Sequence, residues 1–552
     1  MELNLPRLHE AIGRAIPDHD CLIHRDRHLS WAAVTDRTRR FAAALAFHGI
    51  GRHGSLADCE PWESPHDHVA LYLHNGTEYL EAMLGTMKAG GAAVNVNYRY
   101  VADELRYLLT DSRSRALVHH EVFTPVLAEI LDDLPDLELI IRVPDGSGHA
   151  PLPGSLDYEE MLDHADPDLP ADMVEAWSGD DLYLLYTGGT TGAPKGVCWR
   201  QADFLVAALG MRDRSGSEYD SIGPIVERAR DSALRALPSP PFMHGAAHWN
   251  AISAWLAGGT VVVQDHTDHL DPADLLDTCR REAVTSLLIV GDSFARPLIE
   301  ELRRSPREVP TLRFVMSGGA ALTPHVADEL LEVLPQVTIV DVLGSSESGR
   351  QGTRSSKAGG GAAAGFDRSD GSTVLSEDLQ GHLDPGAEEL GWLAQGGRVP
   401  RGYLGDPDKT ARTFPVIDGI RYSVPGDRAR LLADGTIELH GRDAVTINTG
   451  GEKVFAEEVE AALKVHRSVI DAIVVGRPSP RWGSEVAAVV VIRDGEAVDD
   501  EELRESCAEH LARYKLPRTI VRRDHVMRSP AGKPDYAWAR EQVLAETGSI
   551  TP

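Results

Sequence analysis

Apolar runs alternate with helical segments along the first third of the chain. His68–Leu73, Ala92–Val96, Ala116–His119 and Glu138–Val143 are short and largely apolar, which predicts buried strands. The segment Glu78–Ala89 between the first two predicts a helix. Strands that alternate with helices are typical of parallel sheets, so we expect an α/β fold.

Similar patterns lie on either side of this stretch. Near the N-terminus we expect a helix from Leu8, a strand pair around Cys21–Trp31 and a second helix over Ala32–His48. We interpret 211–237, which is charged and helix-prone, as an excursion without a chemical motif, and the Gly/Ala/Ser-rich residues 357–372 as a mobile loop. Three further strands are predicted at Thr260–Gln264, Ser286–Val290 and Phe314–Ser317.

The pattern starts afresh after Gly441-Arg442-Asp443. Because 552 residues exceed what one hydrophobic core usually serves, we expect at least two domains. We predict a large domain over 1–440, a hinge at 441–446 and a small mobile domain over 447–552. The helices and strands expected in the small domain are Ala456–His466, Ile470–Gly476, Val486–Ile492, Asp500–Leu511 and Arg518–Val521.

Composition and charge exclude several classes of protein. With 42% hydrophobic and 25% charged residues the chain is globular. Its formal net charge of -30 opposes adhesion to nucleic acid or anionic lipid. No signal-peptide pattern follows Met1 and no apolar run reaches about 18 residues, so we expect a cytoplasmic protein without a transmembrane segment. The five scattered cysteines predict neither disulfides nor a zinc site.

Candidate chemistry concentrates in Tyr186–Val197, which follows the apolar run Leu182–Leu185. Its glycines leave backbone amides uncovered, its threonines add hydroxyls, and Lys195 adds a positive charge. The spacing differs from both the Walker loop and the dinucleotide fingerprint. Taken alone, such a loop is as often a surface turn as a ligand site. The residues of the expected polyphosphate cradle are Thr187, Gly188, Gly189, Thr190, Thr191, Gly192 and Lys195.

This loop resembles the signature of the adenylate-forming superfamily, which includes acyl-CoA synthetases, adenylation domains of peptide synthetases and luciferases. In that superfamily a carboxylate attacks the α-phosphate of ATP to give acyl-AMP and pyrophosphate, and a thiol then displaces AMP. The resemblance implies a large domain of layered α/β sheets plus a small β-barrel, followed by a small mobile α+β domain. It also implies that ATP, Mg²⁺ and CoA are bound.

Two further segments resemble the superfamily's motifs for adenine and metal. The first segment begins at Ser317, directly after an apolar strand, and would contact adenine and form one wall of the acyl pocket. The other resembles an aromatic-Gly-x-Thr-Glu motif, in which Leu343 replaces the aromatic partner of adenine. Glu347 is its implied catalytic glutamate and, with Thr187, the implied Mg²⁺ ligand. The implied AMP contacts in these segments are Ser317, Gly318, Gly319, Ala320, Asp341, Val342, Leu343, Gly344, Ser345 and Ser346.

Ribose contacts and the catalytic lysine are implied by two later segments. Tyr422–Asp427 resembles the motif in which Asp427 accepts the ribose hydroxyls, and Arg442 is the second contact. Arg528–Lys533 resembles the family's Pro-basic-x-x-x-Gly-Lys. Lys533 would place its ammonium between the attacking carboxylate and the α-phosphate. Either segment alone would be interpreted as a surface turn.

The acyl and CoA sites are implied by shorter likenesses. His244 aligns with a family histidine that lines the acyl pocket, and His248, Trp249 and Gly319 would also contact the acyl group. The ordinary alternative for such a histidine is a packed core residue, and we assign it no proton transfer. In the hinge, Ala444 replaces the usual polar residue. The residues implied at the pantetheine channel are Gly450, Gly451, Glu452 and Lys453.

The resemblance covers nearly the whole chain with its motifs in the family's order. Asn95–Tyr100, Thr446–Val454 and Arg528–Tyr536 are similar to the actinobacterial fatty-acyl and steroid side-chain CoA ligases. The implied function is an ATP-dependent carboxylate–CoA ligase that acts on a fatty, aryl or steroid side-chain acid, as a monomer or a homodimer. Two alternatives stay open: an enzyme that loads a carrier protein or closes a β-lactone without CoA, and a degenerate nucleotide-binding protein.

Overall fold

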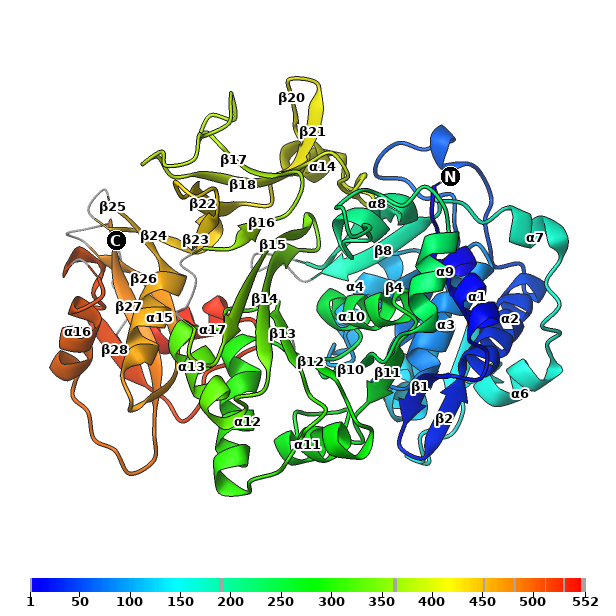
Figure 1. Cartoon of the computed structure of the whole chain (residues 1–552), viewed down its shortest axis with the longest axis horizontal. Coiled ribbons are helices and arrows are strands. Elements are labelled where there is room, and N and C mark those ends of the chain that lie inside the picture. Colours follow the sequence, from blue (N-terminus) through cyan, green and yellow to red (C-terminus); the bar gives the residue numbers. More distant parts are fainter. Residues whose placement is uncertain are drawn as a thin grey trace.

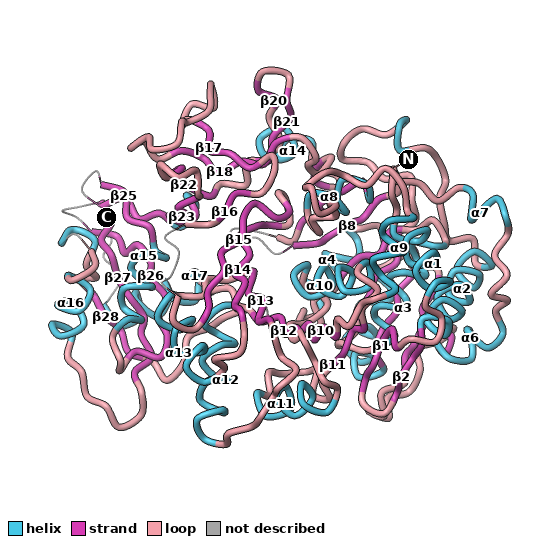
Figure 2. Tube along the Cα trace, viewed as in Figure 1, coloured by secondary structure: helices cyan, strands magenta, loops and turns pink. Residues whose placement is uncertain are grey.

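The computed structural model describes residues 2–187, 193–360, 365–449, 452–479, 483–511, 513–529 and 532–547. Two sheets with parallel centres dominate a large N-terminal domain, and a further sheet forms a small C-terminal domain beside it (Figure 1). Strands run through the interior of these layers and helices cover them (Figure 2). The mixed α/β fold with one large and one small domain confirms the expected fold class.

The first sheet is parallel throughout, with the strand order β4-β3-β5-β6-β7. The prediction of its first four strands is confirmed, because strands buried on both faces are visible in a sequence as short apolar runs. The strands are β3 (His68–Tyr72), β4 (Ala92–Asn95), β5 (Ser114–His120), β6 (Leu139–Val143) and β7 (Leu156–Asp157).

The second sheet has nine strands in the order β16-β15-β14-β13-β12-β10-β11-β1-β2. Its centre is parallel, whereas β14 and β15 form an antiparallel hairpin. Its strands are β1 (Asp20–His24), β2 (Arg27–Ser30), β10 (Arg235–Pro238), β11 (Thr260–Val263), β12 (Ser286–Ile289), β13 (Phe314–Gly318), β14 (Thr338–Ser345), β15 (Gly349–Lys357) and β16 (Asp367–Arg368).

Two segment predictions are wrong in part. In 211–237 the structure has one helix, α9 (Gly223–Arg230), and the segment ends in β10, which lies between β11 and β12. Ala236 and Leu237 are the buried hydrophobic residues of this strand, and two residues are too few to reveal the hydrophobic periodicity that predicts a strand. Within 357–372, the described residues include β16 and the start of β17.

The helices of the large domain pack on the faces of these sheets. Those over the N-terminal half are α1 (Leu5–Ala15), α2 (Trp31–Phe47), α3 (Thr77–Lys88), α4 (Ala102–Asp111), α5 (Thr124–Ile130), α6 (Tyr158–His164), α7 (Ala171–Glu175) and α8 (Gln201–Ala207). The later ones are α10 (Gly245–Leu256), α11 (Pro272–Arg281), α12 (Gly291–Arg304), α13 (Pro324–Val333) and α14 (Pro407–Thr413).

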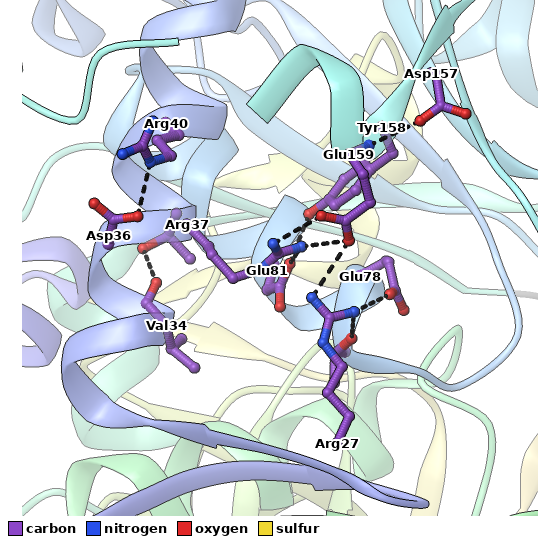
Figure 3. A network of polar contacts seen from close by, with 12 residues as sticks. Arg27, Val34, Asp36, Arg37, Arg40, Glu78, Glu81, Asp157, Tyr158 and Glu159 are labelled. Carbon is purple, nitrogen blue, oxygen red and sulfur yellow. Dashed lines mark hydrogen bonds and ion pairs between the residues drawn. The ribbon is translucent and has the colours of Figure 1, made fainter. Parts of the chain in front are cut away.

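A polar network joins α2, α3 and α6 beside the first sheet (Figure 3). Arg37 binds Glu159 through both terminal nitrogens, at 2.9 and 2.7 Å, and contacts Glu81 at 2.9 Å. Glu81 is fully buried and also accepts a hydrogen bond from the Tyr158 hydroxyl at 3.0 Å. Because its partners compensate the buried carboxylate, the network fixes how these helices pack.

Two antiparallel sheets complete the large domain, in the part of the chain where a small β-barrel was expected; the small β-barrel itself stays a prediction. The three-stranded sheet contains β8 (Leu182–Thr187), β9 (Lys195–Arg200) and β19 (Gly402–Tyr403). The six-stranded sheet contains β17 (Ser372–Leu375), β18 (Gly391–Gly396), β20 (Val416–Ile417), β21 (Ile420–Ser423), β22 (Asp427–Leu431) and β23 (Ile437–Arg442).

The small domain is built on a sheet of the order β25-β24-β27-β26, with β28 beside β27. Its final helix, α17, is absent from the sequence prediction, and its buried residues Ala539 and Val543 pack with Val475 and Val489 of the sheet. Among the described residues, no helix is long and apolar enough to cross a membrane. Its elements are β24 (Thr446–Thr449), β25 (Glu452–Phe455), α15 (Ala456–Val465), β26 (Val469–Ser479), β27 (Gly483–Ile492), α16 (Asp500–Ala508), β28 (Thr519–Arg522) and α17 (Tyr536–Thr547).

Candidate active site

The glycine-rich segment joins two antiparallel strands, β8 and β9. Thr187 ends β8 and pairs in register with Lys195 at the start of β9. The Lys195 ammonium lies 3.4 Å from Asp406. Burial disfavours the charged form of Lys195, but the nearby Tyr107 and Asp406 outweigh it and raise the pKa. The other cradle residues, Gly188, Gly189, Thr190, Thr191 and Gly192, lie outside the described residues.

Glu347 lies in the turn of the β14–β15 hairpin, directly over the β8–β9–β19 sheet. Its carboxylate accepts a hydrogen bond of 2.9 Å from the Tyr403 hydroxyl on β19. The carbonyl of Ser346 accepts one of 2.9 Å from the Trp199 indole on β9. These two bonds hold the hairpin turn against β19 and β9, in the same sheet as Thr187 of β8 and Lys195 of β9.

The expected adenine segments meet at the ends of two neighbouring parallel strands. Ser317 on β13 lies in register with Asp341 on β14, and its hydroxyl accepts a hydrogen bond of 3.3 Å from the Gly291 amide. Burial raises the pKa of Asp341 to about 6, although Arg354 at 2.8 Å favours its charged form. Gly319 has φ +89°, a backbone conformation that glycine adopts without strain.

The residue that replaces the family's aromatic, Leu343, is partly buried. It packs against the apolar core of the six-stranded sheet. Neighbouring Gly344 lies so close to the carbonyl of Gly349 that no Cβ fits there. The hairpin therefore combines an apolar contact with a close backbone approach just before Ser345 and Ser346. The core that Leu343 contacts consists of Val374, Leu393, Ala429, Leu431 and Ile437.

Asp427 and Arg442 are neighbours in the β22–β23 ladder, where their Cα atoms are register partners. The amide of Asp443 donates a 3.0 Å hydrogen bond to the carbonyl of Gly426, so the chain leaving β23 is tied to the turn before Asp427. The side chains of Arg442 and Ala444 are outside what the structure describes. The backbone alone brings the two expected ribose contacts together.

The turn that carries Lys533 docks on the large domain. It is closed by a 2.8 Å hydrogen bond from the Ser529 amide to the Lys533 carbonyl. Gly532 has φ +71°, and a Cβ built on it would lie 2.5 Å from the hydroxyl of Ser293, so glycine permits this docking. A cavity of about 170 Å³ lies between the domains and is lined by Gly532, Ser293 and Phe294 among others.

His244 begins α10 on the large-domain side. Burial first, and then the positive charge of Lys533, lower its pKa to about 3, so the imidazole is neutral. Its Nε2 has no hydrogen-bond partner within the described chain. Both ring nitrogens of His248 have hydrogen-bond partners. Its ring contacts the Tyr183 hydroxyl and the Phe242 carbonyl at 2.7 Å, while the Trp249 indole donates to the same hydroxyl at 2.6 Å. His248 and Trp249 thus hold the base of α10.

The expected CoA segment lies apart from these groups. Glu452 and Lys453 begin β25, which Figure 1 draws at the far left, whereas β8 and α10 lie to the right of the centre. Gly450 and Gly451 are not among the described residues. The orientation of the small domain thus brings the Lys533 turn, and not β25, to Ser293 and the cavity between the domains.

Several supporting residues were missed by sequence reasoning. Asn95 donates to the carbonyls of Tyr186 and Met243, at 2.7 and 2.6 Å, and accepts from the Tyr186 amide at 2.7 Å. Tyr403 and Trp199 hold the Glu347 turn. Asn95 lies in the segment that carries the family likeness, so a signal existed there, whereas none marked Tyr403.

Comparison with known proteins agrees with this architecture. The family model described as "AMP-binding enzyme" matches residues 9–360, and the "AMP-binding enzyme C-terminal domain" matches 458–533. The chain belongs to the AMP-binding enzyme family. Its relatives within that family include the "Medium-chain acyl-CoA ligase Mig" of Mycobacterium avium, 47% identical, with 98% of each chain covered.

A second curated relative is the "3-oxocholest-4-en-26-oate–CoA ligase" of Rhodococcus rhodochrous, 37% identical, with 98% of this chain and 96% of that protein covered. Among solved structures, the anthranilate CoA ligase AuaEII in complex with anthranoyl-AMP superposes with a TM-score of 0.82 at 21% identity, covering 99% of this chain and 98% of the other. ATP-bound MatB from Rhodopseudomonas palustris superposes with a TM-score of 0.77 at 22% identity, covering 98% and 99%. These structural likenesses establish the fold.

Proposed function

We propose that this chain is an AMP-forming acyl-CoA ligase that activates a medium- or long-chain aliphatic carboxylic acid. The reaction class, acid–CoA ligation, is confirmed by similarity to such ligases over 98% of the chain. The acid is proposed from the medium-chain relative, which is 47% identical to this chain. Steroid side-chain acids are the second candidate, because ligases named for them are 37–39% identical.

One observation supports the adenylation step above the others. The Gly532–Lys533 turn of the small domain packs against Ser293 at the start of α12, beside His244 and the cavity between the domains. A mobile ammonium at that place would stabilise the negative charge that develops as a carboxylate attacks the α-phosphate. Because the imidazole of His244 is neutral, an apolar acyl chain bound beside it would not lie against a charged group.

The remaining roles follow from the same arrangement. Glu347, in the turn bonded to β19, and Thr187, at the end of β8 in the same sheet, offer a carboxylate and a hydroxyl oxygen. Such a donor set fits Mg²⁺, and the ion would neutralise phosphate charge when bound. Asp427 and Arg442 would hold the ribose. In the second half-reaction a rotation about 441–446 would exchange the Lys533 turn for Gly450–Lys453 and admit CoA.

The test is a panel of carboxylic acids with ATP, Mg²⁺ and CoA, following AMP release and acyl-CoA mass. We expect acyl-CoA from medium-chain acids, and Lys533→Ala should lower acyl-AMP formation about a hundredfold or more. Lys357→Ala removes an exposed lysine on β15 and serves as the matched control. Acyl-AMP without thioester would point to another acceptor, and no product with any acid would overturn the proposal.

A further inference from the structure

An ion pair with little solvent access joins the two domains. The Lys464 ammonium, on α15 of the small domain, lies 3.1 Å from a carboxylate oxygen of Asp292, at the start of α12 in the large domain. Their side chains are 8% and 9% exposed. Figure 1 shows α15 alongside the layer of α12 and α13. The Arg296 guanidinium adds a 3.4 Å hydrogen bond to the Lys464 carbonyl.

Both partners are tied to groups of the candidate site. Asp292 accepts hydrogen bonds from the amide of Thr323, at 2.8 Å, and from its hydroxyl, so it braces the loop that follows the expected adenine segment. The next residue along the chain, Ser293, is the one against which Gly532 packs. The ion pair therefore lies one residue from the place where the Lys533 turn docks.

A buried pair that spans two domains depends on their orientation. If the small domain turns away, the ion pair between Asp292 and Lys464 is broken. Lys464 then keeps Glu460 of its own helix as a partner, because its ammonium already stabilises the charged form of that carboxylate. The attraction between these two charges, which have little solvent access, therefore favours only the docked orientation. A second interdomain pair, Arg493 with Glu300 at 3.6 Å, is 43% and 56% exposed and contributes little.

We propose that Asp292 and Lys464 are positioning residues for the first half-reaction: their ion pair holds the small domain in the orientation that brings Lys533 to the acid and ATP. This inference rests on the proposed function, since it assigns the docked orientation to adenylation. Thioester formation, which would use the other orientation, does not need the pair. The two half-reactions should then respond differently to its loss.

The experiment measures the two half-reactions separately in the full chain. Acyl-AMP formation is followed by pyrophosphate exchange with a medium-chain acid, and thioester formation is followed from supplied acyl-AMP and CoA. Lys464→Met removes the charge, Lys464→Arg retains it, and Asp292→Asn keeps an acceptor for Thr323. Arg493→Met removes the exposed pair as a matched control. Thermal unfolding of each variant is recorded alongside.

We expect Lys464→Met and Asp292→Asn to lower the maximal rate of pyrophosphate exchange about tenfold or more, with KM for the acid and thioester formation nearly unchanged. Lys464→Arg should recover most of the rate, and Arg493→Met should match the unaltered protein. Equal losses in both half-reactions, or none, would overturn the inference. Absence of exchange in the unaltered protein with every acid would instead count against the proposed function.

Discussion

The two sheets with parallel centres share an architecture but contribute differently to the candidate site. The carboxyl ends of β12, β13 and β14 in the nine-stranded sheet lead directly into Asp292, Ser317–Ala320 and the Glu347 turn. The carboxyl ends of β3 and β4 in the five-stranded sheet lead into Asn75 and Asn95, which are buried and bonded to other loops. We propose that the nine-stranded sheet presents groups of the candidate site to a ligand, whereas the buried asparagines of the five-stranded sheet hold loops in place.

This division has a physical origin in where each polar side chain finds its partners. Asn95 is saturated by the backbone of Tyr186 and Met243, and Asn75 binds the Pro240 carbonyl at 3.0 Å. A side chain whose hydrogen bonds are all made within the protein stabilises the fold and has little capacity left for a ligand. The Glu347 carboxylate, by contrast, accepts one hydrogen bond from the described residues, that of the Tyr403 hydroxyl, and retains acceptor capacity.

Replacing Glu347 should give the largest effect on activity and the smallest on stability. We expect Glu347→Gln to lower acyl-AMP formation about a hundredfold, because the variant lacks the negative charge that a hard cation requires. The Mg²⁺ concentration that gives the maximal rate should be higher for Glu347→Gln than for the unaltered protein. The measurement is pyrophosphate exchange across a Mg²⁺ titration, with exposed Glu388→Gln as control. A variant with full exchange and lowered stability would place Glu347 among the scaffold residues and remove the contrast.

Asn95→Ala tests the other sheet. Three buried hydrogen bonds are lost, and the carbonyls of Tyr186 and Met243 are left without this donor, so the free energy of unfolding should fall by about 3 kcal/mol. Urea denaturation measures the change, and Asn97→Ala in the neighbouring loop is the matched control. If Asn95→Ala left stability intact and abolished only activity, Asn95 would have to be counted as a ligand contact.

Much of this contrast was visible in the sequence and part of it was not. The sequence predicted β3 to β6 of the five-stranded sheet and β11, β12 and β13 of the nine-stranded sheet, because buried parallel strands are apolar runs, but it did not predict β10 or β14. The motif residues were predicted because each motif is local. Tyr403 and Glu347 are 56 residues apart, and Asp292 and Lys464 lie in different domains. Such contacts depend on topology, which no local pattern encodes. Helix α17 was missed because few of its residues are apolar and buried.

Buried histidines at the end of the five-stranded sheet give the last test. His119 is fully buried on β5, and burial lowers its pKa to about 4, outweighing the contact between its Nδ1 and the His120 carbonyl. The folded protein therefore binds this proton only near pH 4, whereas an unfolded histidine binds it near its ordinary pKa of about 6.5. Stability from the neutral ring is present above pH 6.5 and is lost as the pH falls towards 4.

His119→Asn should remove one share of that acid sensitivity, about 1.4 kcal/mol per pH unit between pH 6 and 4, with little change in the pH profile of acyl-AMP formation. Urea denaturation at several pH values measures the slope, and exposed His149→Asn is the control. Burial also lowers the pKa of His66, His120 and His248 to about 4, so part of the slope persists. An unchanged slope would mean that His119 is not a source of this acid sensitivity, whereas a shifted activity profile would mean that this sheet end titrates with the site and does more than support it.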